Sequence, residues 1–180
     1  MSQQLTWPER LGAAIGMQAA IEELDPEQTF KGTVPRLKAT EDAIAAFESQ
    51  RGELLPAAYR DFLQCADGWE LAYFTMDIFG LPELQGAGRW QHAQDLLSSY
   101  EAEGDLEESE LEATDLLPVA AGQGSDLVVI IRDGRPDAGT VIWFDGGEYG
   151  RYTDFAEFFE IVVGMLQAWV EQQQAASVEP

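Results

Sequence analysis

Basic residues are scarce in this sequence. Ten lysines and arginines stand against 33 aspartates and glutamates, which gives a formal net charge of -23. Such an acidic surface repels nucleic acid phosphates and anionic lipid headgroups, so we expect neither nucleic acid nor a membrane as a partner. A cationic protein would be attracted, although the charge also has a simpler explanation in solubility.

Cysteine and long apolar runs are also nearly absent. Cys65 is the only cysteine, which excludes an intrachain disulfide and favours a reducing compartment. No apolar run reaches the ~18 residues of a membrane span, and the first residues lack a basic stretch followed by an apolar one. We therefore expect a soluble, cytoplasmic protein.

Histidine, too, is represented by a single residue, His92. Neither Cys65 nor any serine lies in a recognisable nucleophile motif, and one histidine with one cysteine provides too few ligands for zinc. The Gly122–Asp126 segment is too short for a phosphate-binding loop, and the acidic run lacks the spacing of a calcium loop. We expect no enzymatic activity, no cofactor and no metal site.

The stretch Leu55–Trp69 carries the clearest local signals, in a chain that is 46% hydrophobic. Pro56 suits the first position of a helix, where no amide hydrogen is needed. An apolar face follows at three- and four-residue spacing, formed by Tyr59, Phe62, Leu63 and Ala66. Gly68 is expected to end the helix in a left-handed conformation and to aim Trp69 inward.

Periodicity elsewhere predicts an α+β fold: a mostly antiparallel sheet with helices packed on one face, an N-terminal helix and a long C-terminal helix that starts at Thr153. The expected strands lie in 72–81, 116–121, 126–133, 140–145 and 149–152. We expect a helical extension at 1–36, an α+β domain at 37–172 and a flexible tail at 173–180.

Three segments together resemble the opening of the SUKH superfamily. They are Thr-Glu-Asp-x-Ile-x-x-Phe-Glu (40–48), Leu-Leu-Pro-x-x-Tyr-Arg-x-Phe-Leu (54–63) and Asp-Gly-Trp (67–69). A looser match includes Gly-Ser-Asp at 124–126 and extends through Tyr-Thr-Asp-Phe-x-x-Phe at 152–158. The superfamily includes the yeast Smi/Knr cell-wall-assembly regulator and many bacterial toxin-immunity proteins. The resemblance implies an α+β domain that binds a partner protein and catalyses nothing.

Two features are candidates for the binding surface. The first is a set of residues at the ends of predicted turns, namely Asp67, Glu70, Asp145, Glu148 and Tyr149. The second is the segment Glu101–Asp115, which holds eight acids and no basic residue and could steer a cationic partner. Of the aromatic residues, we expect Trp69 in the core and Tyr149 on the surface. Trp143 and Phe144 alternate along a strand, so we expect one of them in the core.

Two hypotheses for function remain open. In the first, the chain is an immunity protein that neutralises a cationic toxin domain, for example a nuclease, by direct binding. In the second, it is a regulatory or scaffolding adaptor of the cell-wall-regulator type. The first predicts one tight partner and the second several weaker ones.

Overall fold

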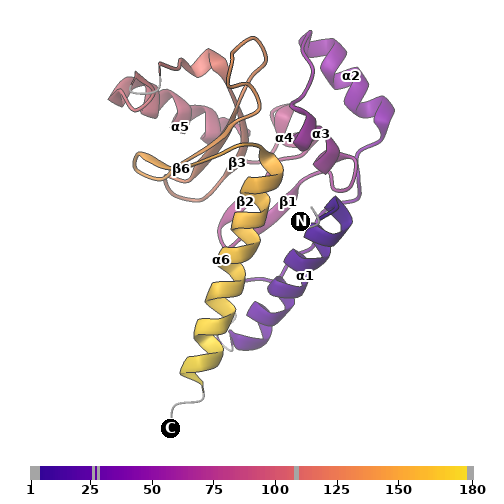
Figure 1. Ribbon diagram of the computed structural model, residues 1–180, viewed down its shortest axis with the longest axis vertical. Helices are drawn as coiled ribbons and strands as arrows, with labels where there is room; N and C mark the ends of the chain where they lie inside the picture. The colour runs from indigo at the N-terminus through magenta and orange to yellow at the C-terminus, as the bar shows by residue number, and fades with distance from the viewer. Residues whose placement is uncertain (1–4, 26, 28, 108–109, 178–180) are drawn as a thin grey trace.

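A computed structural model describes residues 5–25, 27, 29–107 and 110–177. Figure 1 shows a broad head, which contains the sheet, and a narrow stalk of two helices that run side by side and end near the C-terminus. The helices are α1 (Trp7–Leu24), α2 (Glu41–Arg51), α3 (Ala57–Leu63), α4 (Leu81–Leu84), α5 (Trp90–Glu103) and α6 (Phe155–Ala176). A short 3₁₀ helix, η2 (Ala113–Asp115), precedes the third strand.

The sheet has six strands in sequence order, and each neighbouring pair is antiparallel. The strands are β1 (Trp69–Tyr73), β2 (Met76–Ile78), β3 (Leu116–Ala121), β4 (Leu127–Ile131), β5 (Val141–Phe144) and β6 (Glu148–Tyr152). The prediction of an α+β fold with an antiparallel sheet and helices at both ends of the chain is confirmed.

Helices cover both faces of the sheet, whereas the sequence pointed to one. Phe144 stacks on Tyr100 of α5, and its neighbour Trp143 packs edge-on against Phe158 of α6. Adjacent strand residues point to opposite faces, so α5 and α6 lie on opposite sides of β5. Every residue of β3, β4 and β5 is consequently buried, and both Trp143 and Phe144 belong to the core.

The stalk is formed by α1 and α6, which run parallel. Trp7, at the start of α1, contacts Phe155 and Phe159 at the start of α6, and Ile21 further along shares a second apolar cluster with Leu166. Arg10 adds an ion pair to Glu160 at 2.7 Å. The N-terminal helix therefore packs along α6 and contributes to the core.

Both boundaries of α6 differ from the sequence expectation. The long helix α6 is capped by Asp154, whose carboxylate accepts the N–H of Glu157, and not by Thr153. It continues to Ala176, so residues 173–176 of the expected tail are helical. Residues 178–180 of that tail lie outside the described residues.

Helix α3 is shorter than expected. Pro56 occupies the N-cap position, and the helix ends at Leu63 with Gln64 as its C-cap. Gly68 does have a positive φ of 84°, but it lies beyond the helix end, so it does not terminate α3. Trp69 is fully buried, as predicted.

Gly68 instead permits close contact with the segment that follows β2. A Cβ atom on Gly68 would meet the backbone of Gly80, and one on Gly80 would overlap the carbonyl group of Asp67. Nearby hydrogen bonds hold the same two segments together: the Tyr59 hydroxyl donates to the Phe79 carbonyl at 2.7 Å, and the Leu81 N–H donates to Asp67 at 2.7 Å. The Asp-Gly-Trp motif is thus a packing junction.

Gly80→Ala should lower the free energy of unfolding by about 1–3 kcal/mol, because the new methyl group collides with backbone atoms that cannot rotate away. The matched control is Gly164→Ala in α6, where a Cβ meets nothing and alanine should stabilise the helix by roughly 0.5–1 kcal/mol. Urea unfolding of both variants measures the difference. Equal stability of the two variants would contradict the proposed backbone contact.

Candidate partner-binding surface

The turn between β5 and β6 places one aromatic side chain in solvent. Trp143 pairs with Gly150 and Phe144 with Glu148, so Tyr149 is an extra residue that forms a β-bulge. A bulge re-aims the side chain of its extra residue. The ring of Tyr149 lies 4.8 Å from that of Trp143, centroid to centroid, and Tyr149 remains 57% exposed.

Trp143 connects this turn to the hairpin formed by β1 and β2. Its ring meets that of Tyr73 edge-on at 5.7 Å, although β1 and β5 are separated by three strands in the sheet order. The hairpin therefore curls over the face of the sheet. Trp143 is only 4% exposed, so it serves as the buried support for half-buried Tyr73 and exposed Tyr149.

The tip of the β1–β2 hairpin extends the aromatic surface toward the stalk. Phe74 has a positive φ of 50°, a conformation that costs a bulky residue about 1–2 kcal/mol. In this conformation Phe74 contacts Phe30 at 4.7 Å and Trp169 of α6 at 5.9 Å. A strained residue of this kind is a reason to look for a function.

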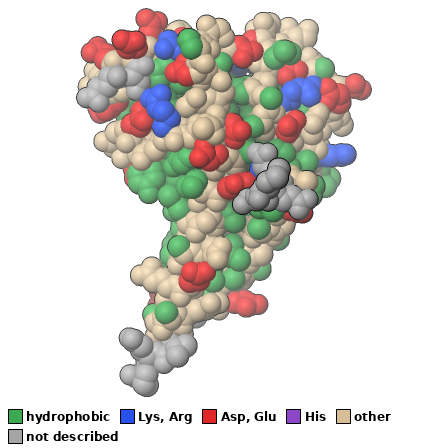
Figure 2. Space-filling model, in the orientation of Figure 1, with side chains coloured by type: hydrophobic (Ala, Val, Ile, Leu, Met, Phe, Trp, Pro, Cys, Tyr) green, Lys and Arg blue, Asp and Glu red, His purple; other side chains and the backbone are tan. Residues whose placement is uncertain are grey.

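We call the connected rings the aromatic band. It runs from the bulge in β6 to the stalk and consists of Tyr149, Trp143, Tyr73, Phe74, Trp169 and Phe30. Except for Trp143, all of them are half-buried or exposed. Figure 2 shows hydrophobic side chains gathered below β6, where the head meets the stalk.

Carboxylates border the end of the band near β6. The hydroxyl of Tyr100 donates to the carbonyl of Ser125 at 2.7 Å and accepts the N–H of Gly146 at 2.9 Å, which joins the β3–β4 and β5–β6 turns. Ser125 in turn donates to Asp145. Burial, together with Asp145, Asp105 and Asp126, raises the pKa of the Tyr100 phenol, so three aspartates surround this corner.

Three of the five residues chosen from the sequence meet at this corner. Asp145, Glu148 and Tyr149 lie within the same turn and the start of β6, and all three are exposed. Glu148 forms an ion pair with Arg151 at 2.8 Å. The expected surface position of Tyr149 is confirmed.

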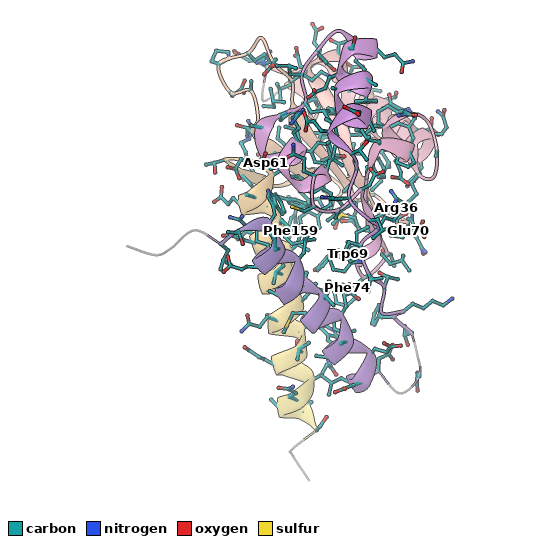
Figure 3. All side chains as sticks on the ribbon, turned by 90° about the vertical axis from the view of Figure 1, so that its right-hand side faces the viewer. Arg36, Asp61, Trp69, Glu70, Phe74 and Phe159 are labelled. Carbon is teal, nitrogen blue, oxygen red and sulfur yellow. The ribbon has the colours of Figure 1, made fainter. Side chains whose placement is uncertain are left out.

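The other two residues, Asp67 and Glu70, lie at the start of β1. Asp67 holds the packing junction, since its carboxylate accepts the N–H of Leu81 and its carbonyl accepts a hydrogen bond from Arg36. Glu70 is exposed and lies 3.5 Å from Arg36. Figure 3 shows Arg36, Glu70 and Trp69 together near the junction of head and stalk. Within the part of the chain that the structure describes, neither Asp67 nor Glu70 contacts the corner around Tyr149.

The acidic segment Glu101–Asp115 is more structured than a solvated loop. Its first residues complete α5, and Leu106 and Leu111 are buried. A cavity of about 500 Å³ is lined by these two leucines and by Glu101, Glu107, Glu110 and Glu112. Glu108, one of the eight acids, lies outside the described residues.

Sequence reasoning missed Tyr73, Phe74 and Asp126 as parts of this surface. The side chains of Tyr73 and Phe74 approach Trp143 and the stalk only after the hairpin has folded over the sheet. Asp126 reaches Trp143 through the pairing of β4 with β5. The sequence predicts a strand over residues 72–81, whereas the adjacent Tyr73 and Phe74 lie at the turn between β1 and β2. Two adjacent aromatic residues at a turn are the signal that could have identified this part of the surface.

The candidate catalytic residues show no joint arrangement. His92 contacts the carbonyl of Gly124 at 3.2 Å, and burial, together with Asp61, raises the pKa of the Cys65 thiol, which makes it a weaker nucleophile at neutral pH. Within the described parts of the chain, no group of three or more histidine, cysteine, aspartate or glutamate residues could hold a metal ion.

Of the helices in the described residues, none combines the length and the apolar character needed to cross a membrane.

The fold and surface define an acidic α+β domain that presents aromatic side chains beside carboxylates. A family model for the SMI1 / KNR4 family (SUKH-1) matches residues 38–161, which is more than half of the chain. The chain belongs to this family. A comparison with curated proteins finds no match. Helix α1 precedes the matched residues, and residues 162–176 of α6 follow them.

Proposed function

We propose that this protein is a non-catalytic immunity protein that neutralises a cationic bacterial toxin domain by direct binding in the cytoplasm. The observation that carries the proposal is the exposed Tyr149 on its bulge, supported by buried Trp143 and flanked by Asp145 and Glu148. Tyrosine and tryptophan provide large, rigid contact area at low entropic cost, and they are enriched among the residues that dominate binding energy.

Charge supports a cationic partner. With a net charge of -23, the chain attracts positively charged proteins and raises their association rate. An enzyme that acts on nucleic acid needs a basic substrate surface, and carboxylates that take the place of phosphates can cover that surface. A toxin nuclease is therefore a suitable class of partner.

Co-expression with the toxin-like protein encoded nearest to this gene tests the proposal. We expect growth to be rescued and the purified complex to have a Kd of nanomolar order or below. Stopped-flow association at 50 mM and 500 mM salt should show a decrease in rate of about tenfold or more, because screening weakens long-range attraction.

The internal control is the dissociation rate of the same complex. Measured at the same two salt concentrations, it should change much less than the association rate. Absence of both rescue and complex formation would refute the immunity role. Several partners of micromolar affinity, none of them a toxin, would support an adaptor instead.

A further inference from the structure

Asp126 occupies an unusual position beside the aromatic band. Its Oδ1 accepts a hydrogen bond from the indole N–H of Trp143 at 2.9 Å, and the residue is half-buried. Oδ2 accepts no hydrogen bond from any residue that the structure describes, and in the same part of the chain no lysine or arginine pairs with this carboxylate.

Aromatic rings surround the same indole. Tyr149 lies 4.8 Å from Trp143 with a tilt of 55°, and Tyr73 meets Trp143 at 5.7 Å and 88°. Trp143 thus joins two accessible tyrosines to a carboxylate. Burial is the main factor that raises the pKa of Tyr73, and the nearby Tyr149 and Asp126 raise it further, which agrees with a shared location for these groups.

We propose that Asp126, Tyr149 and Tyr73 form a subsite for one arginine side chain of the partner protein. The proposal rests on the proposed function and specifies the chemistry of its contact. A guanidinium group is planar, stacks on aromatic rings and donates parallel hydrogen bonds to a carboxylate. A lysine ammonium group is a compact charge and would use the flat rings less well.

The electrostatic state of Asp126 supports a cationic ligand. Burial raises the pKa of Asp126, the hydrogen bond from Trp143 lowers it, and nearby Asp145 raises it. The ionised carboxylate is therefore held at a cost in the free protein, and a bound cation would relieve that cost. The amide oxygen of Asp126→Asn can still accept the hydrogen bond from Trp143. Because the variant no longer carries the costly charge, it should unfold at the wild-type temperature or slightly above it at pH 7.

The test uses the full chain labelled with ¹⁵N and the peptide acetyl-Gly-Arg-Gly-amide as the probe. The indole N–H resonance of Trp143, assigned with Trp143→Phe, reports directly on the hydrogen bond to Asp126. We expect a saturable shift of this resonance, about tenfold weaker binding in Asp126→Asn, and no response to the citrulline peptide, which has the same shape without the charge.

Asp61→Asn is the matched control, because it removes one exposed carboxylate elsewhere on the surface. Figure 3 shows Asp61 well separated from Phe74, a member of the band. Its affinity for the arginine peptide should equal that of the wild type. Tyr149→Ala should also weaken binding and keeps the test informative if Asp126→Asn fails to fold.

Three results would overturn the subsite: equal affinities of the wild type and Asp126→Asn, equal shifts with the citrulline peptide, or an affinity for acetyl-Gly-Lys-Gly-amide equal to that for the arginine peptide. Failure of the proposed function is separate. If the protein rescues growth but does not respond to the peptide, the subsite is wrong and the immunity role stands. If it binds the peptide but does not rescue growth, the immunity role is wrong and the subsite stands.

Discussion

Replacing Trp7 with alanine should lower the free energy of unfolding by about 3–5 kcal/mol, the range for removing a buried aromatic side chain. Trp7 is 9% exposed and lies against three rings, those of Phe62, Phe155 and Phe159, at 5.3 to 5.9 Å. Its removal opens a cavity between α1, α3 and α6, whose mutual packing depends on these contacts.

Leu5→Ala is the control for this prediction. Leu5 lies two residues before Trp7 and is 47% exposed, so its truncation should change stability by no more than about 0.5 kcal/mol. Chemical unfolding followed by tryptophan fluorescence and by far-UV circular dichroism measures both variants. A loss below 1 kcal/mol in Trp7→Ala would show that α1 is a dispensable addition.

The position of Trp7 bears on how the chain is divided. The family model begins at residue 38, yet the aromatic core of the head includes a residue from α1. We expected residues 1–36 to form a helical extension that packs against the domain. Since Trp7 shares its cluster with Phe62 of α3, loss of α1 would expose the apolar face of α3 as well as that of α6.

Local signals in the sequence predicted many elements well. Thr40 caps α2 by accepting the N–H of Ala43, and Gly52 ends it with a φ of 73°, which are the roles that a threonine before an acidic first turn and a glycine after a helix favour. The apolar run before Asp133 forms β4, a central strand. These features depend on neighbours within a few residues, so the sequence contains the information that determines them.

Errors arose where distant segments meet. The positive φ of Gly68 was expected to end α3, but it serves the contact with Gly80, which is twelve residues away. The turn at Gly146 correctly indicated that Tyr149 is exposed. The contact of Tyr73 with Trp143 was missed, because it requires the β1–β2 hairpin to fold over the sheet. Such contacts leave no periodic pattern in the sequence.

Asp67 illustrates why residue type and turn position are weak guides to a binding site. It and Asp145 are both acids next to glycine, yet Asp67 accepts a backbone N–H at the packing junction while Asp145 remains exposed. The difference is set by what lies across from each carboxylate: the N-terminus of α4 for Asp67, and the Ser125 hydroxyl beside solvent for Asp145. Charge reversal at Asp67 should therefore act mainly through folding.

Replacing Tyr149 with alanine should weaken binding of the neutralised toxin by about 2 kcal/mol or more, roughly 30-fold in Kd. Tyr149 is 57% exposed in the free protein and its ring packs against that of Trp143 at a tilt of 55°, so it is already held in one orientation before a partner arrives. Such preorganisation reduces the entropy lost on binding. Most of the loss should appear as faster dissociation.

Leu54→Ala is the matched control, because Leu54 is also exposed, at 67%, and lies in the connection between α2 and α3. Its toxin affinity should equal that of the wild type. Tyr149→Ala itself should fold normally, since an exposed side chain contributes little to the core. Surface plasmon resonance with each variant gives both rate constants. If Tyr149→Ala and Leu54→Ala bind equally well, the partner does not use the aromatic band, and the acidic cavity beside Leu106 and Leu111 becomes the next surface to mutate.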